Sequence, residues 1–146
     1  MPRDPTGGPY LMAAFFCEKV LIEQDGTVSF IRVIDKFSIS GQSEQMPLTI
    51  LRFHIVVMVK SGAFRGLGNF TITPFTPAGS QMTSIPLRAQ LEGDDDKYAA
   101  VVGAIEFPVQ EPGPYWFDVC LNGQMLTNTA IRVMYQPIFM QRPAPG

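Results

Sequence analysis

The chain has 146 residues, of which 46% are apolar and only 16% are charged. This length is typical of one domain that buries about two-thirds of its unfolded surface, and the composition excludes a disordered chain. The formal net charge of −2 supplies no basic surface for nucleic acid or an anionic membrane, so we expect neither as a partner.

Both ends of the chain are predicted to lie outside the folded domain. Residues 1–10 contain three prolines and two glycines, which disfavour helix and strand, so we expect a flexible N-terminal arm. The apolar run 11–17 is too short for a membrane span and lacks the small residues of a signal-peptide cleavage site. We therefore expect a cytoplasmic protein with one domain at 11–136 and a C-terminal tail at 137–146.

Apolar side chains recur at every second position through most of the chain, which is typical of strands with one buried face. The segment 98–109 also fits helical spacing, but its β-branched residues, Gly103 and Pro108 favour a strand; a helix stays the alternative. The pattern predicts an all-β, antiparallel, two-sheet β-sandwich of eight or nine strands. The expected strands are 13–24, 27–34, 37–40, 48–60, 70–75, 83–92, 98–109, 115–121 and 127–135.

Two dipeptides predict tight hairpin turns between these strands. Asp25-Gly26 and Asn122-Gly123 are strong signals for two-residue turns, because both central residues of such a turn adopt positive φ. Gly26 and Gly123 are therefore expected to be structural residues.

The segment Glu111-Pro-Gly-Pro-Tyr-Trp-Phe117 carries the most informative local pattern. In immunoglobulin-like sandwiches a tyrosine placed like Tyr115 after Gly113 bonds its hydroxyl back to the turn and fixes the sheet corner. The cysteine that antibody domains place two residues later is Phe117 here. Cys120 has the opposite parity, so we expect it and Cys17 to be free thiols. The expected architecture is immunoglobulin-like without the antibody disulfide.

Two further segments carry a family resemblance. Phe15-Phe-Cys-Glu-Lys-Val20 with the turn and strand up to Asp35 resembles the opening of a family of uncharacterised bacterial proteins, classed only as a domain of unknown function. The closing turn, strand, Asn-Gly turn and strand over 112–135 are similar to the end of that family. The resemblance covers roughly 11–136 and implies a small antiparallel sandwich with no known chemistry.

Candidate chemistry is sparse along the chain. His54 is the single histidine and lacks a nucleophile motif, so we expect no catalysis. Asp94-Asp95-Asp96 cannot converge on one calcium ion, and the glycines at 62, 66 and 68 lack the residues that follow them in a phosphate loop. We expect no metal, no cofactor and no enzyme activity.

An interaction surface is the leading functional hypothesis. Eight methionines and eleven phenylalanines on a charge-poor chain exceed what one core hides, and such residues are enriched at interfaces. We expect a non-catalytic protein-interaction or self-association module, with a homo-oligomer or another protein as the partner, because the strands around Trp116 and Arg132 offer apolar surface. The alternative is a small ligand such as a sugar, bound at loops and stacked on Trp116 or Tyr98. The candidate contact residues are Arg52, His54, Trp116, Asp118 and Arg132.

Overall fold

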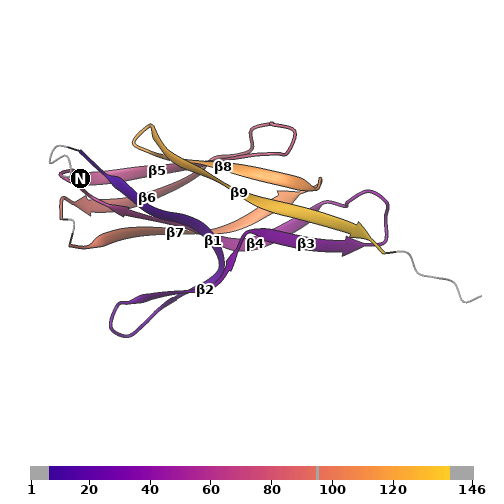
Figure 1. Ribbon diagram of the computed structural model, residues 1–146, viewed down its shortest axis with the longest axis horizontal. Helices are drawn as coiled ribbons and strands as arrows, with labels where there is room; N and C mark the ends of the chain where they lie inside the picture. Colours follow the sequence, from indigo (N-terminus) through magenta and orange to yellow (C-terminus); the bar gives the residue numbers. More distant parts are fainter. Residues whose placement is uncertain (1–6, 95, 139–146) are drawn as a thin grey trace, which may run out of the picture.

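The computed structural model describes residues 7–94 and 96–138, and these form two packed β-sheets (Figure 1). No helix in these ranges is long and apolar enough to cross a membrane. Nine strands follow one another in this part of the chain. They are β1 (Tyr10–Ile22), β2 (Val28–Ile34), β3 (Lys36–Gly41), β4 (Thr49–Lys60), β5 (Arg65–Phe75), β6 (Ile85–Glu92), β7 (Tyr98–Val109), β8 (Gly113–Leu121) and β9 (Gln124–Pro137).

The strands divide into a four-stranded sheet, in the order β2-β1-β4-β7, and a five-stranded sheet, in the order β3-β9-β8-β5-β6. All pairs are antiparallel except β3 and β9, which run parallel. The prediction of purely antiparallel sheets is therefore wrong at this edge. The cause is Asp35, where the chain leaves β2 in one sheet and enters β3 in the other, beside the strand that ends the fold.

The inner faces of both sheets bury the alternating apolar residues that the sequence predicts. Phe117 of β8 lies 4.8 Å from Phe16, 6.4 Å from Phe53 and 5.1 Å from Phe107, measured between ring centroids. These four rings are almost fully buried. Because Phe117 belongs to one sheet and the other three to its partner, the cluster joins the two layers.

The ambiguous segment 98–109 is a strand throughout, and the helical alternative is wrong. Every residue of β7 has a partner on β4. Gly103 lies where the two layers approach closely, since a Cβ there would stand 3.2 Å from Leu87 of β6. Pairing along the whole of β4 outweighs the weak helical spacing.

The two hairpin turns form where predicted but differ in type. Asn122 and Gly123 both have positive φ, 50° and 84°, as a two-residue turn requires. In the first turn Gly26 alone has positive φ, and its N–H donates to the Glu23 carbonyl at 3.0 Å. The first turn is therefore a longer hairpin loop closed by a glycine, and the expectation of positive φ at Asp25 is wrong.

The tyrosine corner predicted at Tyr115 is present. The Tyr115 hydroxyl donates to the Glu111 carbonyl at 2.8 Å, and the ring is 1% exposed. Burial raises the pKa of this phenol above its ordinary value. Gly113 has φ 128°, and a Cβ there would lie 2.9 Å from Pro77, so the turn into β8 excludes larger residues.

Several element boundaries differ from the prediction. Tyr10, assigned to the arm, begins β1, and Pro137, assigned to the tail, ends β9. Strand β5 begins at Arg65, inside the expected glycine turn, and continues through Pro74. Most of the predicted arm (1–6) and tail (139–146) lies outside the described residues.

Replacement of Tyr115 by phenylalanine tests the corner. Tyr115→Phe should lower the free energy of unfolding by about 0.5–1.5 kcal/mol, because it removes a hydrogen bond and leaves the Glu111 carbonyl without that donor. Chemical denaturation measures the loss.

Tyr135→Phe is the matched control, since the Tyr135 hydroxyl donates to the exposed Ser43 carbonyl at 2.6 Å. Water can replace that donor, so its loss should be smaller. Equal losses for both variants would contradict a special role for the corner.

Candidate functional site

The outer faces of the two sheets differ in composition, and this difference locates the candidate site. In a sandwich whose outer faces meet water, outward positions along each strand are expected to be polar. The five-stranded sheet has mixed outward positions, where polar rows separate exposed apolar side chains such as Leu67, Trp116 and Met134, whereas the four-stranded sheet has adjacent apolar rows.

Three of the predicted contact residues lie on the outer face of the five-stranded sheet. Trp116 is 46% exposed, between Phe75 and Ala130 on the neighbouring strands. Asp118 lies one step further along β8, flanked by Thr73 and Asn128. Trp116 therefore lies in an apolar cross-strand row, Phe75–Trp116–Ala130, and the row of Asp118 beside it is polar.

Arg132 lies on that same outer face, paired across the strands with Pro114 and Lys36. The two neighbouring positive charges, on Arg132 and Lys36, make this edge of the five-stranded sheet basic. Arg132 and Asp118 are not cross-strand partners, so they form no ion pair that could orient a ligand.

The other two predicted residues, Arg52 and His54, lie on the opposite side of the molecule, on the outer face of the four-stranded sheet. Arg52 Nε donates to Glu106 Oε1 at 3.4 Å, and both side chains are about three-quarters exposed, at 76% and 73%. His54 Nδ1 lies 3.1 Å from the backbone carbonyl oxygen of Glu18. The structure thus separates the five predicted contact residues into two distant groups.

Outward residues of β1, β4 and β7 form six cross-strand rows, and the five beyond the end row of Lys60 and Tyr98 make up what we call the apolar face. Three rows are largely apolar and adjacent, one is the charged pair, and one closes the end of the sheet. The rows are Ala13–Met58–Ala100, Phe15–Val56–Val102, Cys17–His54–Ala104, Arg52–Glu106 and Ile50–Pro108. Exposed apolar side chains here include Ile50 at 47% and Val102 at 38%.

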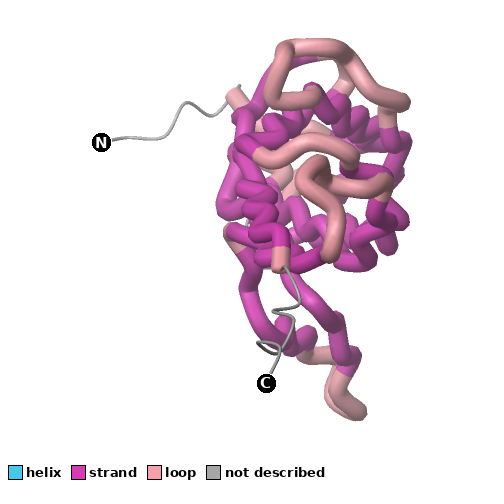
Figure 2. Tube along the Cα trace, turned by 90° about the vertical axis from the view of Figure 1, so that its right-hand side faces the viewer, coloured by secondary structure: helices cyan, strands magenta, loops and turns pink. Residues whose placement is uncertain are grey.

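The hairpin of β1 and β2 adds apolar side chains beside the apolar face. Figure 2 shows it projecting from the body of the sandwich, and Figure 1 shows β2 on the side away from β8 and β9. Phe30 of the hairpin contacts Phe15 edge-on, with ring centroids 5.0 Å apart. Four apolar side chains on the hairpin are strongly exposed: Leu21, Ile22, Ile31 and Val33, at 44%, 78%, 38% and 67%.

A hollow of about 460 Å³ at the charged end of the apolar face brings titratable side chains together, among them Glu18, His54 and Glu106. Each carboxylate already has a cationic partner, because Glu18 pairs with Arg32 at 3.3 Å and Glu106 with Arg52. Within residues 7–94 and 96–138 no group of three or more His, Cys, Asp or Glu side chains could hold a metal ion.

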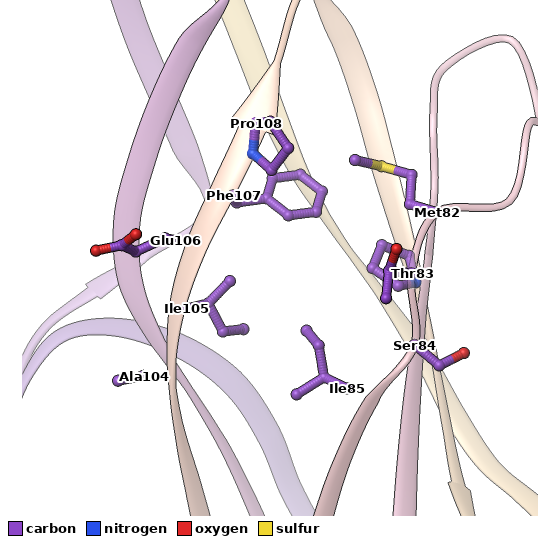
Figure 3. Close-up of a pocket in the computed structure, with 10 residues that line it drawn as sticks. Met82, Thr83, Ser84, Ile85, Ala104, Ile105, Glu106, Phe107 and Pro108 are labelled. Carbon is purple, nitrogen blue, oxygen red and sulfur yellow. The ribbon is translucent and has the colours of Figure 1, made fainter.

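A pocket of about 490 Å³ lies where the edge strands β6 and β7 diverge (Figure 3). Ile105 and Phe107 point into it from β7, and Ile85 and Met82 face them from the other side, whereas Glu106 points away. Its volume falls within the usual range for small-ligand sites. Neither Trp116 nor Tyr98 lines this pocket.

The two residues expected to stack on a sugar cannot share a site. Tyr98 begins β7, and Phe107, nine residues later at the other end, lies beside Tyr115 with ring centroids 5.4 Å apart. Trp116 follows Tyr115 on β8, so it lies near that second end, about 30 Å along the strand from Tyr98. Of the acidic turn, Asp94 and Asp96 are described and Asp95 is not; the Asp96 N–H donates to Asp94 at 2.9 Å.

Sequence reasoning missed the apolar face, although the chain carries a signal for it. Strand β7 is apolar at nearly every position, and three of the six outward residues of β4 (Ile50, Val56 and Met58) are apolar as well. A near-continuous apolar run is typical of a strand that is buried on both faces. Counting the apolar residues at both the inward and the outward positions of each strand would have identified those that the core does not need.

A family model described as "Family of unknown function (DUF6941)" matches residues 12–134. No curated protein matches the chain. Among solved structures, an immunoglobulin-like protein from Pseudomonas aeruginosa is 15% identical with a TM-score of 0.46, covering 87% of this chain and 97% of that one. A β-glucosidase from Listeria innocua in complex with glucose is 12% identical with a TM-score of 0.48, over 92% of this chain. A calcium-binding mutant of β-glucuronidase 2 from Bacteroides uniformis is 15% identical with a TM-score of 0.44, over 62% of this chain. The match spans only 18% and 13% of those two enzymes.

Cys17, in the third row of the apolar face, predicts a pH dependence of stability. It is fully buried, and this burial raises the pKa of its thiol above 9.0. The unfolded chain therefore ionises first, so the free energy of unfolding should fall as pH rises above about 9, by at most about 1.4 kcal/mol per pH unit. Denaturation between pH 8 and about pH 10 measures the slope.

Cys17→Ala should flatten that slope, and Cys120→Ala, at a partly exposed position, should leave it unchanged. A slope that survives in Cys17→Ala would assign the alkaline loss of stability to another group.

Proposed function

Since this chain belongs to a family described only as of unknown function, we propose from its physical chemistry that it is a non-catalytic protein-interaction module. Its contact surface is the apolar face together with the β1–β2 hairpin. Contacts are made by burying apolar side chains such as Phe15, Met58 and Val102, and the Arg52–Glu106 pair at the end of the face gives orientation.

The contrast between the two outer faces carries this proposal. On the four-stranded sheet the apolar row Phe15–Val56–Val102 has apolar rows beside it, whereas on the five-stranded sheet the row of Trp116 lies between rows that contain Asp118 and Arg132. Exposed contiguous apolar surface is costly in water and marks an interaction site in a folded protein. An evenly solvated sandwich would carry charged residues at Val102, Ala104 and Ile50.

The pairing of the titratable groups supports a role without catalysis. A general base needs a free reactive group within hydrogen-bond reach of a nucleophile, held by an orienting partner. His54 is instead placed against a backbone carbonyl, and the neighbouring carboxylates of Glu18 and Glu106 face arginines.

Site-specific photocrosslinking in the organism that encodes the chain tests the proposal. A benzoylphenylalanine at Val102, which is 38% exposed, should give discrete protein crosslinks identifiable by mass spectrometry. The same probe at Met134, 41% exposed on the five-stranded sheet, is the matched control and should give few. Crosslinks at position 134 but not at position 102 would refute the assignment of the contact surface.

Small-ligand binding is a second candidate, favoured by the pocket between β6 and β7. Apolar side chains such as Ile105, Phe107 and Met82 line it, whereas the Ser84 hydroxyl points away from it (Figure 3) and lies 2.9 Å from the Thr73 hydroxyl. This lining favours an apolar ligand over a sugar, since a sugar needs several converging polar groups.

Titration with the fluorescent dye anilinonaphthalene sulfonate tests the pocket. A saturable site with a Kd of about 10–100 µM is expected for a ligand of this size. Thr83→Trp should fill the pocket and abolish that site, and Thr71→Trp, at an exposed position of β5 outside the pocket lining, should not. Dye binding that both variants leave unchanged would exclude this pocket as the site.

A further inference from the structure

We propose that the partner of the apolar face is a second copy of this chain, stacked face to face about a two-fold axis. This inference rests on the proposed function and names its partner. The face carries the small side chains of Ala13, Ala100 and Ala104 around the larger Phe15 and Val102, and the hairpin covers part of it, where Phe30 packs on Phe15. Apolar sheet faces pack against each other about 10 Å apart, as the two sheets of a sandwich do.

The face and the hairpin together approach the area that a stable dimer needs. The three strands of the face, about 4.8 Å apart and with about ten residues each at about 3.3 Å per residue, present an area of about 480 Å². A stable complex buries about 800 Å² per partner. The relief of the side chains and the exposed hairpin residues Ile31 and Val33 supply further area.

The Arg52–Glu106 row is complementary in charge to a copy of itself, and Lys60 lies beyond the face, in the end row with Tyr98. A two-fold interface places the same patch on both sides, so a patch with net charge repels its copy. A two-fold axis that runs along the strands between β4 and β7 lets Arg52 of each copy approach Glu106 of the other. The five-stranded sheet lacks this balance, because Lys36 and Arg132 are neighbours there.

The hairpin gives the second copy additional surface. A projecting two-stranded hairpin is only marginally stable in water, and this one exposes apolar side chains such as Ile22 and Val33. It projects from the side of the four-stranded sheet (Figures 1 and 2). A copy stacked on the apolar face therefore also meets the hairpin, and burial of Val33 favours association.

Sedimentation equilibrium of the purified full chain tests the inference. At about 100 µM the wild type should have a mass of about 32 kDa, twice the 16.1 kDa of one chain. Val102→Asp should weaken the dimer by at least about 100-fold, because each interface then buries two unpaired charges. Met134→Asp, on the other sheet, should leave the dimer intact, and circular dichroism should confirm that both variants fold.

Charge exchange gives an independent readout. Arg52→Glu and Glu106→Arg should each weaken the dimer by about 10-fold, since each places like charges together across the axis. The double variant restores opposite charges and should return to within about 3-fold of the wild type.

A monomeric wild type at about 100 µM would overturn this inference. If the wild type were monomeric and the probe at position 102 still gave crosslinks to another protein, the proposed interaction module would be retained and that protein would be its partner. A dimer that Met134→Asp breaks and Val102→Asp leaves intact would overturn both the partner and the surface.

Discussion

Phe117 lies at the centre of the contacts that hold the two sheets together. It reaches Phe16, Phe53 and Phe107 across the interlayer space, so one side chain of β8 packs against three strands of the opposite sheet. Tyr115, two residues earlier on the same strand, packs on Phe107 and ties the adjacent turn to the sheet through Glu111. Because side chains alternate along a strand, burying these two residues forces Trp116 outward. The packing of the core therefore determines which side chains of β8 lie on the outer face.

The same alternation makes the four-stranded sheet unusual. Its core needs only one set of positions on β4 and β7, and the chain supplies apolar residues at the other set as well. Val56 and Cys17 are fully buried on the outer face, while Ile50 and Val102 remain exposed beside them. The sheet is thus partly covered by its own hairpin and partly uncovered, which is why we place the interaction surface there.

Local patterns in the sequence predicted the features that depend on local physics. Strand periodicity identified the strand at 98–109. Asn122-Gly123 predicted the two-residue turn between β8 and β9, and the spacing of Gly113 and Tyr115 predicted the tyrosine corner. Each of these needs only the conformational preference of a few residues. The family resemblance predicted the same architecture and the matching family model.

The arrangement of strands that lie far apart in the sequence could not be predicted from such local patterns. Alternation is identical for parallel and antiparallel pairing, so nothing around Asp35 reveals that β3 changes sheets and runs parallel to β9. The alternation of apolar residues also does not reveal which strands are neighbours. The prediction therefore grouped Arg52 and His54 with residues on the opposite side of the molecule, namely Trp116, Asp118 and Arg132. The pocket between β6 and β7 depends on two edges meeting, which only the assembled fold defines.

The edges of both sheets carry interruptions that bear on how far this chain can assemble. Arg32 in β2 has a left-handed backbone, with φ 56°, while Pro86 and Pro108 remove backbone donors from β6 and β7. The fourth edge, β3, is only six residues long. Unbroken, long edges recruit strand after strand into fibrils, and short, kinked or proline-containing edges prevent that growth. These interruptions therefore disfavour edge-to-edge growth of a chain that is this rich in apolar strands.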